Sequence, residues 1–320
     1  MSGEEKRVCV TGGGGCIASW LLKLLLSKGY AVHATIRGDP GDVVKYGHLK
    51  QMIAEEEGKL EVLKADLLDY DSLVAAISGC TAVFHVASPV PYGPVPPNPC
   101  SGTLNVLRVC SSPESNVKRV VIVSSVAAVC ENPKWPLHKP KDETSWSDED
   151  HCTQTNSWYC RLSKTLAEKE ALRYARETSL DVISLCPSLV FGPILQQTPN
   201  ASTSVLLRLL KAEGQTVDNK TRIVVDVRDV AEALVLIYER PEAEGRYICN
   251  AHTVSVGEIV EMLKTMYPNY NYPKSFSTTR EGENDRVSSQ RLQGLGWSYR
   301  PLEETLRDSV ESYTRAGLLD

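Results

Sequence analysis

Short apolar runs rich in β-branched residues recur along the first 190 residues of the chain. Each run is too short for a full helix and is followed by turn residues, which is typical of buried β-strands. The runs lie at 7–11, 31–36, 60–65, 81–87, 119–125 and 180–186, and segments with helical apolar spacing lie at 17–26, 72–77, 102–110 and 162–177. Strands that alternate with helices predict right-handed βαβ units and an α/β fold with a doubly wound parallel sheet.

The pattern becomes less regular after residue 190. Further elements are predicted as helices at 204–212, 227–240, 256–266 and 302–316 and a strand at 246–250. We therefore expect a Rossmann domain over 1–190 and a smaller mixed lobe over 191–320, with some of its strands returning to the first domain. Doubly wound sheets bind ligands outside the carboxyl ends of their strands, so this lobe is predicted to close a substrate cleft.

Composition narrows the choice of partners. The 320 residues are 42% hydrophobic and carry a formal net charge of -5, without a run of Lys or Arg. Nucleic acid and membranes are therefore not expected as partners; we expect a small-molecule substrate and a monomer or weak homodimer. Ten cysteines without CxxC pairs show no zinc pattern and suit reduced thiols, and no apolar run approaches the roughly 20 residues that span a bilayer. These features predict a cytoplasmic protein without a bound metal.

A glycine cluster, TGGGGC, lies between the first predicted strand and a helix. At this place the backbone must turn tightly and let a pyrophosphate approach the helix N-terminus. Two registers fit, Gly12, Gly15 and Ala18 or Gly13, Gly15 and Ala18. The context favours a dinucleotide site over a merely flexible glycine turn.

The end of the second strand indicates which dinucleotide binds. Arg37 stands where an NAD protein has an acidic residue for the ribose 2′-hydroxyl, and Lys45 follows it. Two cations favour a 2′-phosphate and hence NADP(H). The alternative is that Arg37 is a solvated surface residue without a ligand. Asp66, after the third strand, is a candidate for the adenine amino group or for a helix cap.

Reduction of a carbonyl by hydride needs a proton donor and a hydrogen bond to the developing alkoxide. Ser124 or Ser125, at the end of the fifth strand, and Tyr159 are the candidates. A nearby ammonium, that of Lys164, would lower the pKa of the tyrosine by favouring the phenolate, and its other donors would hold the nicotinamide ribose.

Motifs along nearly the whole chain carry a resemblance to a known family. They include TGGGGCIASW, ATIRG, VFHVASPV, VIVSSVAAV, CPSLVFGP, VRDVAEAL and GRYIC. The sequence resembles the plant extended short-chain dehydrogenase/reductases, and within them the cinnamoyl-CoA reductases and cinnamoyl-CoA reductase-like proteins, next to the dihydroflavonol reductases. The resemblance implies an NADPH-dependent oxidoreductase of phenylpropanoid and lignin chemistry that reduces a hydroxycinnamoyl-CoA thioester, or a related aldehyde or ketone.

The same resemblance assigns roles to residues. It makes Ser125 the catalytic serine, Tyr159 the acid and Lys164 the ribose-binding lysine. It makes Arg37 and Lys45 the ligands of the 2′-phosphate. The other cofactor-binding positions that it implies are Gly12, Gly13, Gly15, Cys16, Ile17, Asp66, Leu67, Ala87, Ser88, Pro187, Leu189 and Val190.

One departure from the family concerns the catalytic pair. The family spaces its tyrosine and lysine as Tyr-x-x-x-Lys, whereas Tyr159 and Lys164 are five residues apart, which places them roughly 140° apart on a regular helix. Either a π-bulge absorbs the extra residue and returns Lys164 to the active face, or Lys164 points elsewhere and catalysis is weak. The first alternative is our hypothesis, and the second predicts an NADP(H)-binding protein with little activity.

Other departures concern the substrate. Residues 89–99 hold six prolines and predict an extended loop where the family has the start of a helix. Positions at which CoA-handling relatives carry cations hold Val205, Arg208 and Val256, which makes a free aldehyde or ketone a rival to a CoA thioester. Cys152 and Cys160 match a thiol pair of relatives; a disulfide and two free thiols are both open.

Overall fold

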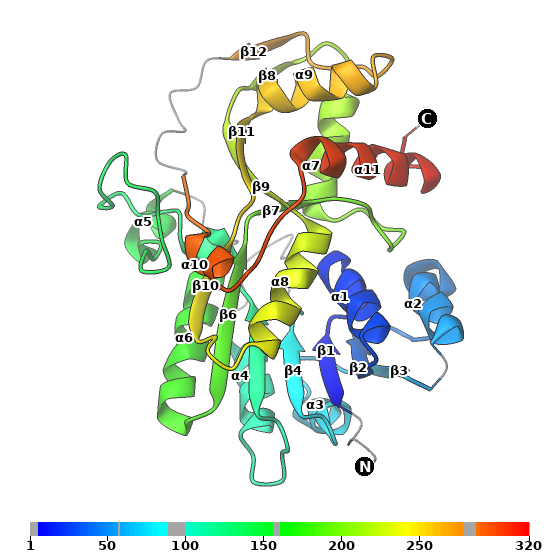
Figure 1. The fold of residues 1–320 in the computed structure, drawn as a ribbon, viewed down its shortest axis with the longest axis vertical. Coiled ribbons are helices and arrows are strands. Elements are labelled where there is room, and N and C mark those ends of the chain that lie inside the picture. Colours follow the sequence, from blue (N-terminus) through cyan, green and yellow to red (C-terminus); the bar gives the residue numbers. More distant parts are fainter. Residues whose placement is uncertain (1–5, 57, 89–99, 156–160, 278–285, 320) are drawn as a thin grey trace.

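Seven parallel strands form the large sheet of the computed structural model, which describes residues 6–56, 58–88, 100–155, 161–277 and 286–319 (Figure 1). Across the sheet the order is β10-β6-β5-β4-β1-β2-β3. The strands are β1 (Arg7–Thr11), β2 (Ala31–Ile36), β3 (Leu60–Lys64), β4 (Ala82–His85), β5 (Arg119–Val123), β6 (Asp181–Pro187) and β10 (Gly245–Cys249). The chain winds outward from β1 to β3 and then returns to place β4 on the other side of β1. This reversal creates the crevice in which doubly wound folds bind nucleotides.

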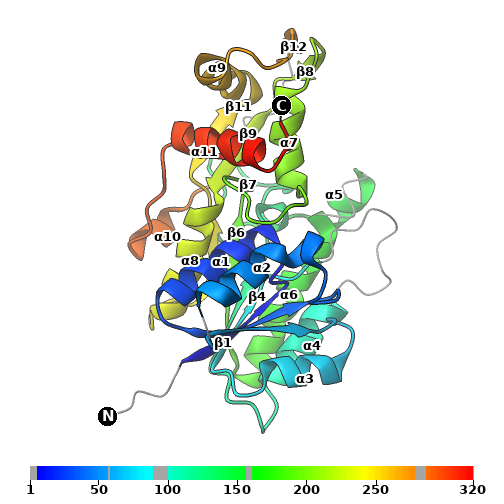
Figure 2. The ribbon, with the colours of Figure 1, turned by 90° about the vertical axis from the view of Figure 1, so that its right-hand side faces the viewer.

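Helices cover both faces of the sheet, as Figure 2 shows. One face carries α1 (Cys16–Ser27), α2 (Val43–Glu55) and α8 (Val227–Glu239), and the other carries α3 (Tyr70–Ile77), α4 (Ser101–Cys110) and α6 (Ser163–Thr178). Alternation along β1 serves both layers, because Val8 and Val10 join the cluster around α1 and α8 while Cys9 joins the cluster around α3 and α4. Each fully buried leucine on the inner side of α1 contributes roughly 1.5–3 kcal/mol through the apolar surface that it removes from water.

A second layer lies beyond the carboxyl ends of the large sheet (Figure 1). It contains a three-stranded sheet of order β11-β9-β7 and a parallel pair of β8 and β12. Its elements are β7 (Leu189–Phe191), α7 (Ala201–Leu210), β8 (Thr216–Asp218), β9 (Thr221–Asp226), β11 (His252–Ser255), α9 (Val256–Met266), β12 (Ser275–Ser277) and α11 (Leu302–Arg315). Leu206, Val260 and Leu306 are buried at its centre. The elements α8, β10 and α10 (Gln290–Gly294) return to the large sheet, where α10 packs on β10. The lobe is therefore not one unbroken stretch of sequence, and the boundary near residue 190 stays a prediction.

The structure confirms the predicted fold class, an α/β fold built on a doubly wound parallel sheet. Every predicted strand and helix of the first 190 residues is found within two residues of its expected ends. The sequence analysis did not predict α2, the 3₁₀ turn η1 (Val126–Ala128), α5 (Glu149–Gln154) or the short strands of the second layer.

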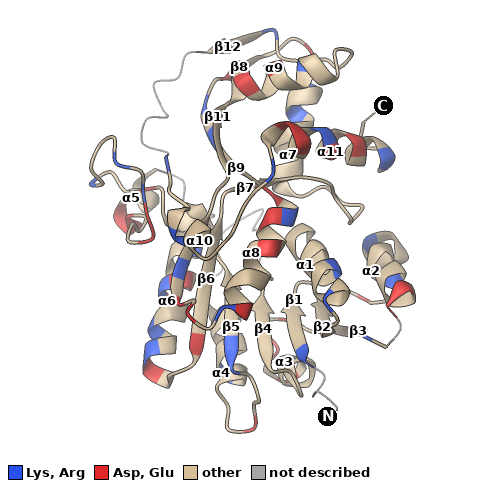
Figure 3. Cartoon of the chain, in the orientation of Figure 1, with Lys and Arg blue, Asp and Glu red and all other residues tan. Residues whose placement is uncertain are grey.

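The charge pattern, the helices and the possible metal ligands bear on the partners expected from composition. Lys and Arg alternate with Asp and Glu on α6 and α11 (Figure 3). Within the described ranges, no helix combines the length and apolarity needed to cross a bilayer. The described residues also hold no group of three or more His, Cys, Asp or Glu side chains arranged to bind a metal ion.

Candidate active site

The glycine cluster forms a tight turn between β1 and α1. Gly12 has a φ of +72°, and a Cβ atom built on it would lie 2.9 Å from the Cα of Ala87. The N–H of Gly15 donates to the carbonyl of Gly12 at 2.9 Å, and Gly15 precedes α1 without a side-chain cap from the described residues. Ala18 is fully buried under this turn. The geometry therefore favours the register Gly12, Gly15 and Ala18, in which Ala87 occupies the space where any residue other than glycine at position 12 would place its side chain.

Tyr46 brings the two predicted 2′-phosphate ligands to one rim of this turn. A Cβ atom on Gly14 would lie 2.5 Å from the Tyr46 ring, and one on Gly38 would lie 2.9 Å from its hydroxyl. Arg37 directly follows β2 and precedes Gly38, while Lys45 precedes Tyr46 in α2 with its ammonium 5.4 Å from the centre of the ring. Both cationic side chains are exposed. Tyr46 was missed in the sequence, because a lone aromatic residue in an unpredicted helix gives no signal.

The carboxyl ends of β3 and β4 bring further predicted positions to the crevice. Asp66 is exposed, and its carboxylate accepts from the N–H of Leu68 at 2.9 Å. The cap of α3 is Asp69, which accepts from Ser72, so Asp66 is not that cap. Leu67 is fixed through its carbonyl, which accepts from the Asn105 amide at 3.0 Å. Ala87 lies against Gly12, with the exposed Ser88 after it. The remaining predicted positions are Ile17 at the start of α1, Pro187 at the end of β6, and Leu189 and Val190 in β7.

His85 links the glycine turn to α4 from inside the protein. Its Nδ1 lies 2.9 Å from the hydroxyl oxygen of Thr11, which also accepts from the N–H of Ala87 at 3.1 Å, and its Nε2 lies 3.1 Å from the hydroxyl of Thr103. Burial, assisted by the ammonium of Lys164, lowers the pKa of His85 to about 3. A neutral, doubly hydrogen-bonded imidazole suits a core residue beside the crevice and not a base.

The two neighbouring serines at the end of β5 have different surroundings. Ser124 is buried, and its hydroxyl donates to the Glu168 carboxylate at 2.8 Å. Ser125 is half-buried at the start of η1, where its hydroxyl oxygen accepts from the N–H of Ala127 at 3.1 Å. An accepting hydroxyl still has its own proton to donate. The environment therefore favours Ser125 over Ser124 as the group that meets a substrate.

Lys164 reaches the same strand end from α6. Its ammonium donates to the carbonyl of Val123 at 3.2 Å, and its charge acts on His85 across the sheet edge. Just before α6, Arg161 and Leu162 are π-helical, which is the feature that the extra residue was predicted to produce. The carbonyl of Arg161 accepts from the Thr165 hydroxyl at 2.7 Å, and its guanidinium pairs with Glu131. Tyr159 and Cys160 lie outside the described residues.

The comparisons with known proteins agree with this arrangement. Residues 8–254 match the family described as NAD dependent epimerase/dehydratase. The chain belongs to this family. Among curated proteins, it is 44% identical to cinnamoyl-CoA reductase 1 of Petunia hybrida, over 98% of this chain and 93% of that protein. It is 42% identical to cinnamoyl-CoA reductase 2 of Medicago truncatula, over 100% and 94% of the two chains.

A solved structure resembles the whole of this epimerase/dehydratase-family chain. Vestitone reductase from alfalfa (Medicago sativa) superposes with a TM-score of 0.83 at 31% identity, over 98% of this chain and 99% of that one. The matches confirm the predicted resemblance to the cinnamoyl-CoA reductase branch of the extended short-chain dehydrogenase/reductases. They also confirm the predicted class, an oxidoreductase of a family that depends on a nicotinamide dinucleotide.

Several positions that the resemblance links to substrate choice lie in the second layer of this family member. Val205 and Val256 pack into its apolar cluster, whereas Arg208 is exposed on α7. Cys16, the first residue of α1, also packs against this cluster, and burial raises the pKa of its thiol to about 11. Cys152 is buried. The alternatives for the Cys152 and Cys160 pair stay open, because Cys160 lies outside the described residues.

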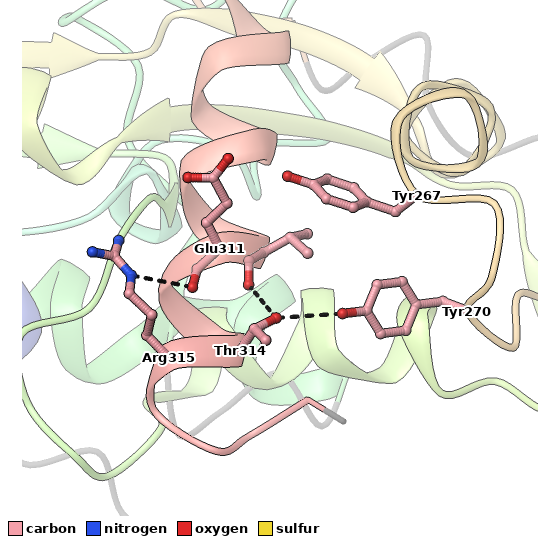
Figure 4. A pocket seen from close by; sticks show the side chains of 6 residues that line it. Tyr267, Tyr270, Glu311, Thr314 and Arg315 are labelled. Carbon is pink, nitrogen blue, oxygen red and sulfur yellow. Dashed lines mark hydrogen bonds between the residues drawn. The ribbon is translucent and has the colours of Figure 1, made fainter.

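A separate depression of about 530 Å³ opens between the end of α9 and α11 (Figure 4). The hydroxyls of Tyr270 and Thr314 lie 3.4 Å apart at its wall. Its lining residues are Tyr267, Tyr270, Val310, Glu311, Thr314 and Arg315. None of them is a predicted site residue, so the depression is not the crevice described above.

Proposed function

We propose that the protein uses NADPH to reduce a phenylpropanoid-type carbonyl, converting a hydroxycinnamoyl-CoA thioester to its aldehyde or a related aldehyde or ketone to its alcohol. The observation that carries the proposal is the approach of Lys164 to the strand end that holds Ser125, at the same sheet edge as the Gly12 turn. The cinnamoyl-CoA reductases among the relatives support the substrate class.

The residues present fit the proposed cofactor. The turn at Gly12 forms a backbone cradle that carries no side chain at this position, because Ala87 occupies the place of a Cβ atom, and α1 begins there without a side-chain cap from the described residues. The backbone N–H groups at this helix start would bind the pyrophosphate, and Arg37 and Lys45 would bind the 2′-phosphate. When bound, NADPH supplies the hydride that reduces the carbonyl carbon.

The protein's own groups would handle the proton. The hydroxyl of Ser125 would donate a hydrogen bond to the carbonyl oxygen and stabilise the negative charge that develops on it. Tyr159 would then protonate that oxygen. Lys164 would lower the pKa of Tyr159 by favouring its phenolate form and would hold the nicotinamide ribose. In this scheme Ser125 orients and stabilises, Tyr159 transfers the proton, and Lys164 tunes the transfer.

The alternative is a dinucleotide-binding protein with little catalysis, which follows if the extra residue between Tyr159 and Lys164 misplaces the lysine. Two observations favour the enzyme. Arg161 and Leu162 are π-helical, and the Lys164 ammonium points to the carbonyl of Val123 at the strand end and not into solvent. A single-residue bulge of this kind is found frequently at functional sites.

A substrate panel with an independent binding measurement tests the proposal. NADPH consumption is followed with a hydroxycinnamoyl-CoA ester, a cinnamaldehyde and a dihydroflavonol, while NADPH binding is titrated by fluorescence. We expect turnover of at least one of these carbonyls. With valines at two of the three positions where CoA-handling relatives carry cations, we expect the free aldehyde to compete well with the CoA ester. Tight NADPH binding without turnover of any carbonyl would establish the alternative.

Two further features of the protein follow as proposals. We infer that it acts on a small molecule, as a monomer or weak homodimer, and that it works in the cytoplasm. The free thiols among the described cysteines support a reducing compartment.

A further inference from the structure

A buried carboxylate lies directly behind the strand end that carries Ser125. Glu168 of α6 is 1% exposed, and Arg246 of β10 is 6% exposed. Their side chains form an ion pair in which the guanidinium Nε donates to one carboxylate oxygen at 2.8 Å and Nη2 to the other at 3.3 Å. Ser184 donates to the same carboxylate at 2.6 Å and Cys186 at 3.3 Å. With the bond from Ser124, the carboxylate is satisfied on both oxygens.

The guanidinium of Arg246 is also fixed by several contacts. Nη1 of Arg246 donates to the carbonyls of Glu143 and Ser145, each at 2.8 Å, and its guanidinium lies 3.5 Å from the centre of the Trp146 ring. The segment that it binds is fixed in turn to η1, because the hydroxyl of Ser147 donates to the carbonyl of Ala127 at 2.8 Å. The pair therefore connects α6, β5, β6 and β10 with the loop that follows Ser125.

Glu168 reaches Ser125 through one neighbour. Ser124 and Ser125 are consecutive residues at the end of a strand, where neighbouring side chains point to opposite sides. The hydroxyl of Ser124 is anchored on Glu168, and its N–H donates to the carbonyl of Leu185 at 2.8 Å. Ser124 is thereby fixed on the side of α6, which sets the direction in which Ser125 leaves the strand.

Glu168 also lies one helical turn from Lys164. Residues four apart share one face of a helix, so the turn that is anchored on β5 and β6 by Glu168 is the turn that aims Lys164 at Val123. Anchoring one face of α6 on the sheet fixes both the rotation and the height of Lys164 relative to the strand end.

We propose that Glu168, neutralised by Arg246, is a positioning residue for carbonyl reduction: through Ser124 it sets the place of Ser125, and through α6 it sets the place of Lys164. This inference rests on the proposed function. A buried ion pair is weak evidence for stability, because the loss of hydration offsets its attraction. Here one bond of the carboxylate goes to Ser124, next to the candidate catalytic Ser125, and the others hold α6 on β6 and β10. These contacts assign the buried pair a role in placement.

Removing either charge would leave the other buried and unpaired, so substitution of Glu168 itself would confuse placement with folding. Ser124→Ala is the sharper probe, because it cuts the tether to the strand end and leaves the ion pair intact. Ser184→Ala is its matched control. It removes the same kind of bond to the same carboxylate, from a position that pairs with Ile122 inside the sheet and away from the strand end.

We expect Ser124→Ala to lower kcat about tenfold or more, since small displacements of catalytic groups are costly, with KM and the NADPH Kd nearly unchanged. Ser184→Ala should keep kcat within about twofold. Its melting temperature should fall by about as much as that of Ser124→Ala, because both variants lose one bond to the same carboxylate. Ser124→Thr, which keeps the hydroxyl, should restore kcat. Equal kcat in Ser124→Ala and wild type, or an equal loss in both alanine variants, would overturn the proposal.

A second measurement does not depend on activity. In hydrogen exchange of peptides covering 124–129, Ser124→Ala should expose the amides of Ala127 and Ala128, which donate to the hydroxyl and carbonyl of Ser125, whereas Ser184→Ala should not. If the wild-type protein reduces no carbonyl, the proposed function fails, and this exchange still decides whether Glu168 fixes the strand end. Unchanged exchange in Ser124→Ala would count against the placement even in an active enzyme.

Discussion

At the scale of single residues, the cofactor cradle depends on backbone that only glycine provides. Gly12 combines a left-handed φ with a close approach to Ala87, which leaves no room for a Cβ atom. Tyr46 makes similar use of Gly14 and Gly38, whose missing side chains let its ring pack between the glycine turn and the end of β2. Small residues here bring the backbone close to where a pyrophosphate would lie.

Gly12→Ala is therefore expected to weaken NADPH binding by about tenfold or more, because the new Cβ must push Ala87 away and the left-handed backbone is strained by about 1–3 kcal/mol. Gly29→Ala is the matched control. Gly29 has a φ of +85°, and a Cβ atom added to it would meet no other atom within 4 Å. It should show the strain as a lower melting temperature without a change in NADPH Kd. Equal Kd values for both variants and wild type would remove the cradle from the cofactor site.

His85 gives a prediction for pH. Its pKa of about 3 in the folded protein lies below the roughly 6.5 of an unfolded chain, so the unfolded state binds a proton first as the pH falls. The stability is fully present above about pH 6.5 and decreases toward pH 3, by up to about 1.4 kcal/mol per pH unit from this one group. His85→Gln should flatten the unfolding free energy measured by urea titration over that range. Parallel slopes for wild type and His85→Gln would contradict the assignment.

At the scale of elements, α6 is the helix on which the candidate site depends. It enters through π-helical residues, carries Lys164 in its first turn and Glu168 in its second, and packs on α4 further along, where Tyr174 and Ser111 hydroxyls lie 2.7 Å apart. Our hypothesis is that the wider turn absorbs the extra residue before the helix reaches Lys164.

Deleting Arg161 restores the Tyr-x-x-x-Lys spacing and tests this account. If the bulge already places Lys164 correctly, the deletion should remove the bulge, leave the rest of α6 in place and keep kcat within about threefold. Deletion of Arg173, in regular α-helix, serves as the comparison. It has no bulge to relieve, so it should turn Tyr174 away from Ser111 and lower the melting temperature. A gain of tenfold or more in kcat on deleting Arg161 would mean that Lys164 is misplaced in the natural sequence.

The elements also show what the sequence could predict. The central strands were predicted because parallel strands buried on both faces are continuous apolar runs. Helix α2 was missed because Val43 and Val44 are exposed while Tyr46 and Leu49 are buried, which blurs its apolar face. The glycine turn could be predicted because a strand, the glycines and a helix follow one another within a short stretch of sequence. Glu168 and Arg246 were not, since they are 78 residues apart and their pairing exists only once α6 and β10 lie on the same sheet.

At the scale of the whole molecule, the second layer lies beyond the carboxyl ends of the large sheet (Figure 1). Its last helix, α11, holds the segment that follows β7, where Leu189 and Val190 are candidate cofactor contacts. The N–H of Gly192 donates to the Ser309 hydroxyl at 2.9 Å, and the N–H of Ile194 donates to the Ser312 hydroxyl at 3.0 Å. Trp20 of α1 adds a bond to the carbonyl of Pro193 at 2.7 Å. The segment is thus fixed to both layers.

Ser309→Ala should therefore loosen the crevice from a distance. The buried N–H of Gly192 would lose its acceptor, which costs about 1–3 kcal/mol of unfolding free energy, measured by urea titration. Because the freed segment adjoins β7, we expect the NADPH Kd to rise as well, by about threefold to tenfold, which corresponds to roughly 0.7–1.4 kcal/mol. Thr314→Ala is the control on the same helix, since its hydroxyl donates to the carbonyl of Val310 within α11 and meets Tyr270 at the surface. It should change neither quantity beyond about 0.5 kcal/mol. A stability loss in Ser309→Ala with an unaltered Kd would show that α11 supports the fold of the lobe alone, and that the cofactor crevice is held by the large sheet and α1 without it.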